Sequence, residues 1–163
     1  MADGTTDHGP MLRGRALSRL RAAMNYWIVT TRPDGRPHAA PVWGVWLDDG
    51  LWFGTMGQKV RNLEARPYAV VHLDSADDVI MVQGSVEIVR DVGRIARAAE
   101  AFRAKYADGE TGEPFDVYPA LGDTPAFYHV VPDTGWAWLE GAYLTHNTRW
   151  SFTPGAADAG EAG

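Results

Sequence analysis

The segment from Thr55 to Leu63 combines a hydroxyl, a glycine, two cations and two amides at the expected start of a helix. The first N–H groups of a helix lack intrahelical partners, and an arginine can grip two oxygens of one anion. This pattern is typical of a phosphate site, with Thr55, Lys59, Arg61 and Asn62 as candidate ligands. Lys59 and Arg61 lie about 200° apart on a helical wheel, so both reach one anion only if Lys59 precedes the helix. The alternative is a surface helix with solvated charges and Asn62 as a local cap.

Other kinds of catalytic site find little support in the sequence. None of the five histidines has a partner at the spacing of a metal site, and the absence of cysteine excludes disulfides, thiolate catalysis and cysteine-bound metals. Serine occurs without the Gly-x-Ser-x-Gly elbow of hydrolases, and no Gly-x-Gly-x-x-Gly follows a strand. His38 and His72 fall within expected strands, where a structural role is more frequent. The sequence therefore indicates no metal site and identifies no catalytic side chain.

Length and charge restrict the class of protein. The 163 residues fit one domain, and the net charge of -6 argues against a general nucleic-acid binder, which needs a basic face. No stretch reaches the ~18 apolar residues of a membrane span, and the polar N-terminus lacks the apolar core of a signal peptide. We therefore expect a cytoplasmic protein with a domain at residues 12–152 and disordered tails at 1–11 and 153–163.

Apolar periodicity and turn residues predict a mainly β chain with three helices. Helices are expected over 12–24, 59–65 and 93–106, and a long loop over 107–124. Strands are expected at 26–31, 37–47, 51–55, 68–73, 79–90, 126–131, 135–139 and 148–152, the first three forming a meander. Antiparallel strands with inserted helices predict an α+β fold around a barrel rather than a βαβ layer.

Tryptophan is frequent, and four of the seven residues, Trp27, Trp43, Trp46 and Trp52, fall within the expected meander. Core packing is the default role for such side chains. A small barrel cannot easily bury tryptophan on both faces of its strands. Some of these residues are therefore expected to line a ligand pocket or a subunit contact.

Six features follow one another along the chain: the first helix, Trp27-Ile28-Val29-Thr30-Thr31, the turn Pro33-Asp34-Gly35-Arg36-Pro37, Pro41-Val42-Trp43, Lys59-Val60-Arg61-Asn62-Leu63 and Thr148-Arg149-Trp150-x-Phe152. In this order and spacing they resemble the pyridoxamine 5′-phosphate oxidase-like family. The similarity covers about residues 12–152. It is strongest to the actinobacterial flavin and deazaflavin oxidoreductases, many of which use coenzyme F420.

The resemblance implies a split β-barrel homodimer with two cofactor sites at the subunit interface. The ring of the cofactor would lie against the second strand, and its phosphate at the basic helix start. Three groups of residues would surround it: Pro41, Val42 and Trp43 beside the ring, Thr55, Lys59, Arg61 and Asn62 at the phosphate, and Gln83 and Trp138 from the partner subunit.

The resemblance leaves two cofactors open, because Met56-Gly57-Gln58 precedes Lys59 where other members carry more cations. The leading expectation is an oxidoreductase in which reduced coenzyme F420 transfers a hydride to an unsaturated or conjugated small molecule. An oxidase or reductase that uses flavin mononucleotide (FMN) is the second. A non-catalytic module that binds flavin, deazaflavin or haem is the third.

Overall fold

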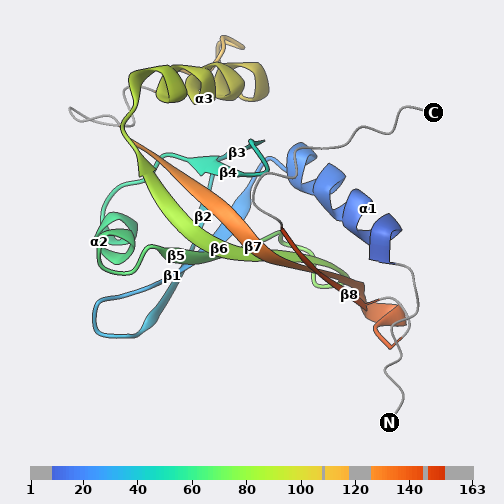
Figure 1. Cartoon of the computed structure of the whole chain (residues 1–163). Helices are drawn as coiled ribbons and strands as arrows, with labels where there is room; N and C mark the ends of the chain where they lie inside the picture. Colours follow the sequence, from blue (N-terminus) through green and yellow to red (C-terminus); the bar gives the residue numbers. More distant parts are fainter. Residues whose placement is uncertain (1–8, 108, 118–125, 145–146, 153–163) are drawn as a thin grey trace.

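A computed structural model describes residues 9–107, 109–117, 126–144 and 147–152 of the chain (Figure 1). Its centre is an antiparallel sheet in the order β2-β1-β5-β6-β7-β4-β3, with β8 paired to β7. The strands are β1 (Tyr26–Thr31), β2 (Pro37–Val42), β3 (Val45–Leu47), β4 (Gly50–Phe53), β5 (Tyr68–His72), β6 (Asp78–Val89), β7 (Phe127–Leu139) and β8 (Asn147–Ser151). The sheet coils into a half barrel around the long β6–β7 ribbon, which confirms the mainly β, α+β fold class.

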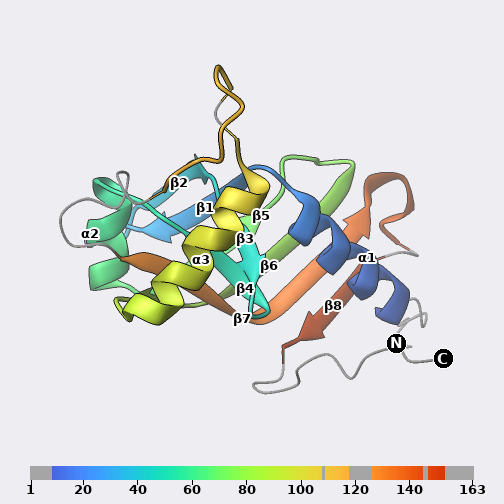
Figure 2. The same cartoon turned by 90° about the horizontal axis from the view of Figure 1, so that it is seen from above.

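The helices α1 (Gly9–Ala22), α2 (Gln58–Ala65) and α3 (Val92–Lys105) pack on two core clusters. Ala16 and Leu20 of α1 join Leu63 of α2 in the larger cluster, which fills the barrel. The second cluster lies under α3, which crosses the sheet above β3 and β4 in Figure 2. Since α1 begins at Gly9, the predicted domain boundary at residue 12 falls inside this helix. The rest of the two predicted tails, 1–8 and 153–163, lies outside the described residues.

The predicted strand over 37–47 and the meander built on it are wrong, because the chain breaks between β2 and β3 at Trp43 and Gly44. β2 pairs only with β1, and β3 turns to pair with β4. A Cβ on Gly44 would lie 2.9 Å from the backbone oxygen of Trp52 and 2.6 Å from Leu51 Cδ1, so the close crossing over β4 requires glycine. The backbone groups of Gly44 bind Lys105 and Tyr106 of the α3 end instead of a neighbouring strand. These partners lie far along the sequence and give no local signal.

The two predicted closing strands, 126–131 and 135–139, form the single strand β7. The pair Pro132-Asp133 suggests a break, but the register against β6 shifts there, with Gln83 opposite Thr134 and Gly84 opposite Pro132. Such a bulge absorbs one extra residue without ending the ladder. Tyr68 donates to the carboxylate of the extra residue, Asp133, at 2.7 Å.

One face of the sheet is left open beside α3. The side chains that point outward from β1, β5, the first half of β6 and the second half of β7 belong to neither core cluster, and several are large and apolar. They include Trp27, Val29, Val70, Met81, Trp136 and Trp138, whose positions follow from the strand registers. We call this surface the open face.

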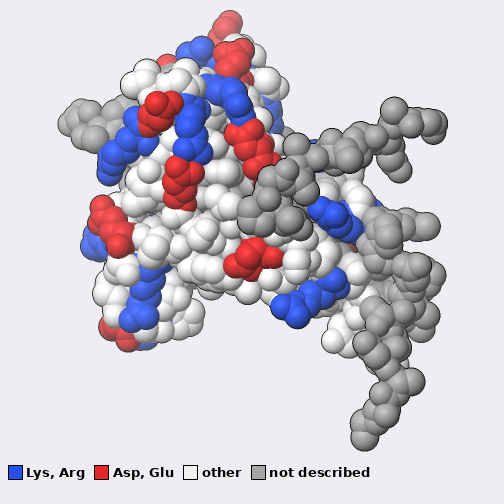
Figure 3. Space-filling view, in the orientation of Figure 1, with Lys and Arg blue, Asp and Glu red and all other residues white. Residues whose placement is uncertain are grey.

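Charged side chains of both signs gather over α3, whereas the surface below it is mostly uncharged (Figure 3). The net acidity is therefore not concentrated in one patch on this side of the molecule. None of the helices that the structure describes is long and apolar enough to cross a membrane.

Candidate functional site

The connection from β4 to α2 carries the predicted phosphate segment and separates two hollows. Gly57 stands at the N-cap of α2 with φ 71°, and no side chain caps the helix. The helix begins at Gln58, so Lys59 already lies in its first turn. The condition under which Lys59 and Arg61 could grip one anion together is therefore not met, and each cation lines a different hollow.

The first hollow, called here the apolar hollow, has a volume of about 250 Å³. It lies between the end of β2, the end of β4, α3 and the loop that follows α3. Its described lining is Pro41, Val42, Trp43, Gly54, Thr55, Met56, Lys59, Phe102, Phe115 and Val117. Flat apolar walls with one cation at the edge suit a planar aromatic ligand.

The second hollow, called here the arginine hollow, has a volume of about 550 Å³. Its described lining is Thr55, Met56, Gly57, Val60, Arg61, Glu64, Arg90, Ala126 and Tyr128. Thr55 and Met56 line both hollows, which therefore meet at this point. Among the described residues neither Arg61 nor Arg90 forms an ion pair. Burial and the charge of Glu64 raise the pKa of Tyr128, so its hydroxyl remains a neutral donor.

Thr55 supplies an unused hydroxyl where the two hollows meet. Its Oγ1 is buried and has no hydrogen-bond partner among the described residues. A buried polar atom without a partner costs about 1–3 kcal/mol. A rotation about χ1 toward an anion in the hollow would satisfy this atom, so the residues present fit a phosphate.

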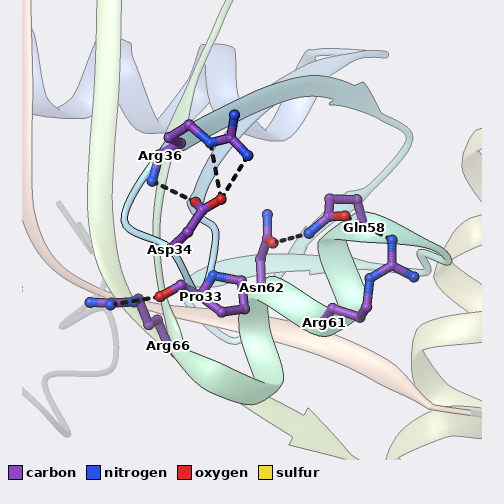
Figure 4. A network of polar contacts seen from close by, with 7 residues as sticks. All are labelled: Pro33, Asp34, Arg36, Gln58, Arg61, Asn62 and Arg66. Atoms are coloured by element: carbon purple, nitrogen blue, oxygen red, sulfur yellow. Dashed lines mark hydrogen bonds and ion pairs between the residues drawn. The ribbon is translucent and has the colours of Figure 1, made fainter.

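Asn62 does not face either hollow, although the sequence suggests it as a phosphate ligand or a local cap. It is fully buried, and its Nδ2 donates to Thr30 Oγ1 of β1 at 2.8 Å. Its Oδ1 accepts from Gln58 Nε2 at 2.7 Å, and Gln58 Oε1 accepts from Arg61 Nη2 at 2.7 Å (Figure 4). Asn62 therefore anchors α2 to the sheet and reaches Arg61 through Gln58.

Trp43 is held by the end of α3. Its ring stacks on Tyr106 with centroids 4.9 Å apart and meets Phe115 edge-on at 5.1 Å. The Tyr106 hydroxyl accepts from the Gly44 N–H at 2.9 Å and lies 2.7 Å from Met24 O. Tyr106 is a supporting residue that sequence reasoning missed, because only its place at the end of an amphipathic helix could have indicated it.

Lys105 joins the same support, since its Nζ donates to Gly44 O at 2.7 Å and to the Tyr26 hydroxyl at 2.9 Å. The amine also lies over the rings of Tyr26 and Tyr106. Burial lowers the pKa of Lys105 to about 8. The same burial raises the pKa of Tyr26.

Gln83 and Trp138 line neither hollow within one chain. Both lie on the open face, Gln83 opposite Val70 and Trp138 opposite Val79. Their contribution from a partner subunit stays a prediction. No group of three or more potential metal ligands occurs among the described residues.

The comparisons with known proteins agree with this architecture. The family model for pyridoxamine 5′-phosphate oxidase matches residues 15–130. No curated protein matches the chain. A conserved hypothetical protein from Mycobacterium tuberculosis superimposes with a TM-score of 0.62 at 21% identity, over 89% of this chain and 93% of that one.

Two further solved structures share the fold. A haem binding protein from Mycobacterium smegmatis gives a TM-score of 0.61 at 16% identity, over 83% of this chain and 57% of that one. An F420 reductase gives 0.52 at 25% identity, over 72% of this chain and 93% of that one. The predicted split β-barrel is thereby confirmed, and the chain belongs to the pyridoxamine 5′-phosphate oxidase family.

Proposed function

We propose that this protein is an oxidoreductase that binds reduced coenzyme F420 and passes a hydride to an unsaturated or conjugated small molecule. The observation that carries the proposal is the junction at Thr55 and Met56, where the apolar hollow meets the arginine hollow. A planar ring with a phosphorylated side chain needs two such surfaces side by side. FMN has the same two parts and is the second candidate.

The apolar hollow would receive the ring. Pro41, Val42 and Trp43 form one wall, and Phe102 and Phe115 form another. These side chains would exclude water and fix the orientation of the ring toward a substrate. When bound, the cofactor itself supplies the hydride chemistry.

The arginine hollow would receive the phosphate. Arg61 can form a charge-assisted pair with two oxygens, the Thr55 hydroxyl lacks a partner, and the first N–H groups of α2 carry no side-chain cap. Lys59 would stand beside the ring, at the edge of the apolar hollow. Lys59 and Arg61 would therefore not bind the same anion. Arg61 would bind the phosphate, and Lys59 would contact the ring.

The similarity to an F420 reductase supports the deazaflavin over FMN. The similarity to a haem binding protein raises haem as a third ligand, as the sequence does. No histidine is among the described residues that line the hollows, so this part of the lining offers no imidazole to an iron. The domain that would bind the cofactor is taken as residues 12–152.

The proposal includes a homodimer formed across the open face. Pro41 of the apolar hollow lies opposite Trp27 of that face, so a second copy placed there would border the ring site. Gln83 and Trp138 on the same face would then approach the partner's cofactor. An obligate contact of this kind buries roughly 2,000 Å² or more.

The first experiment is to purify the protein from a host that makes both F420 and FMN, and to record the absorbance spectrum and mass of the bound chromophore. A bound deazaflavin in a dimeric protein is the expected result. A haem spectrum, or a monomer by light scattering at micromolar concentration, would contradict the proposal.

The second experiment compares Arg61→Ala with Arg66→Ala. Both changes remove one arginine at α2, but Arg66 donates to Pro33 O, away from the hollows (Figure 4). Arg61→Ala should weaken binding of the phosphorylated cofactor by roughly ten- to a hundredfold and barely change binding of its dephosphorylated form. If the two variants changed cofactor affinity equally, the alternative interpretation would be correct, in which this segment is a surface helix with solvated charges.

A further inference from the structure

The side chains of Arg61, Gln58, Asn62 and Thr30 form one continuous line of hydrogen bonds, called here the polar chain. Arg61 Nη2 donates to Gln58 Oε1, Gln58 Nε2 to Asn62 Oδ1, and Asn62 Nδ2 to Thr30 Oγ1, at 2.7, 2.7 and 2.8 Å. The Thr30 hydroxyl in turn donates to His38 O at 3.3 Å. The polar chain therefore runs from an exposed arginine to the buried hydroxyl of Thr30 in the hairpin of β1 and β2.

The direction of every bond in the polar chain is fixed by its two ends. A backbone carbonyl only accepts, so the Thr30 hydroxyl must donate to His38 O and accept from Asn62. A guanidinium only donates, so Gln58 must turn its oxygen to Arg61 and its amide nitrogen to Asn62. The two amides can satisfy both ends in only one orientation each. This arrangement holds Gln58 Oε1 toward Arg61.

The inner end of the polar chain is rigid. Asn62 and Thr30 are almost completely buried, at 0% and 1% exposure, and both belong to regular elements. Gln58 is half-buried at the first position of α2, and Arg61 is exposed. A long exposed side chain is thus tied by one of its five N–H groups, which leaves the others free to bind an anion.

We infer that Gln58 is a positioning residue that holds the Arg61 guanidinium at the arginine hollow for the phosphate of the cofactor. The inference rests on the proposed function, because it assigns Gln58 to the same anion site. Immobilising a flexible side chain on binding is costly, and a side chain that is already held avoids this cost. For one arginine the gain corresponds to about three- to tenfold in affinity.

The test is a double-mutant cycle of Gln58→Ala and Arg61→Ala, titrated with FMN, riboflavin, F420 and its dephosphorylated form. Gln58→Ala should weaken binding of the phosphorylated ligands about three- to tenfold and leave the dephosphorylated ones unchanged. In the Arg61→Ala background the same change should have no further effect. Arg66→Ala, a change at the end of the same helix but outside both the polar chain and the arginine hollow, should not weaken binding.

The outcomes of this cycle distinguish a failure of the positioning role of Gln58 from a failure of the proposed phosphate site. If Arg61→Ala weakens phosphate binding and Gln58→Ala does not, the positioning role is wrong and the phosphate site stands. A full Gln58→Ala effect in the absence of Arg61 would also overturn the positioning role, since Gln58 would then act directly or through the fold. If Arg61→Ala leaves the binding of every ligand unchanged, the phosphate site itself is wrong.

Discussion

The apolar and arginine hollows meet at Thr55 and Met56 but hold their principal side chains by different means. Trp43 is held by ring packing on Tyr106 and by the grip of the α3 end on the Gly44 backbone. Arg61 is held by the polar chain, which uses only side-chain hydrogen bonds to reach the sheet. Packing fixes a flat wall, whereas directional bonds fix a charge at one place. The affinities for the ring and for the phosphate should therefore change independently.

The largest expected effect is that of Asn62→Ala, because this change removes the buried link between α2 and β1. The variant loses two hydrogen bonds and leaves the Gln58 amide without its acceptor. The free energy of unfolding of the cofactor-free protein should fall by about 2–3 kcal/mol. Urea denaturation measures this change, and phosphate-dependent affinity should fall with it.

The matched control is Asn25→Ala, at an exposed asparagine beyond the end of α1. A surface change of this kind should alter the free energy of unfolding by less than about 0.5 kcal/mol. If the two variants lowered the free energy of unfolding equally, the buried hydrogen bonds of Asn62 would contribute no more to stability than an exposed side chain. The claim that hydrogen bonds hold the arginine hollow would then be wrong.

Tyr106→Phe should have the next largest effect, and it acts on the other hollow. The variant keeps the ring that stacks on Trp43 but loses the hydroxyl that binds the Gly44 backbone and Met24 O. The expected loss of stability is about 1–2 kcal/mol. Binding of the phosphorylated and dephosphorylated cofactors should weaken by the same factor, because only the ring wall is disturbed.

Tyr143→Phe is the control for this change, since Tyr143 is half-exposed at the far end of the β7–β8 hairpin. It should change neither stability nor affinity. A selective loss of phosphate affinity in Tyr106→Phe would show that the two hollows are not independent. Isothermal titration with each pair of ligands distinguishes these results.

Local signals in the sequence were sufficient for most elements of the fold. The turn Asp48-Asp49-Gly50 joins β3 and β4 between the predicted strands 37–47 and 51–55, with both aspartates in the left-handed region at φ 53° and 55°. This backbone conformation is the one a two-residue hairpin turn needs, and Asp tolerates it. The apolar spacing of the second and third helices likewise placed α2 and α3 within one residue at each end.

Contacts between residues that are distant in the chain could not be predicted, because no local sequence pattern indicates them. The break at Gly44 depends on Tyr106, which lies 62 positions further along the chain. The inward direction of Asn62 depends on Thr30, which lies 32 positions before it. The composition of the phosphate segment identified the region of the two hollows. The sequence could not show that Lys59 and Arg61 line different ones.

The smallest expected effect concerns Lys105 and appears only as a dependence on pH. Burial lowers the pKa of its amine from 10.5 to about 8 in the folded protein, while the unfolded chain keeps the higher value. Between these two values the unfolded state binds more protons, so the free energy of unfolding should rise with pH. The raised pKa values of Tyr26 and Tyr106 reverse this trend above about pH 10.

Lys105→Met should remove the rise in stability between about pH 8 and 10. The expected rise in the free energy of unfolding is only about 1 kcal/mol, because the amine is half-exposed to solvent. Its hydrogen bond to Gly44 O and the two ring faces also favour the charged form and so reduce the rise. Arg103→Met, which removes an exposed cation from the same helix, should keep the rise. Urea denaturation at pH 7.5, 8.5 and 9.5 decides between them. An unchanged rise in Lys105→Met would mean that this amine is as well solvated as a surface lysine and that another group causes the pH dependence.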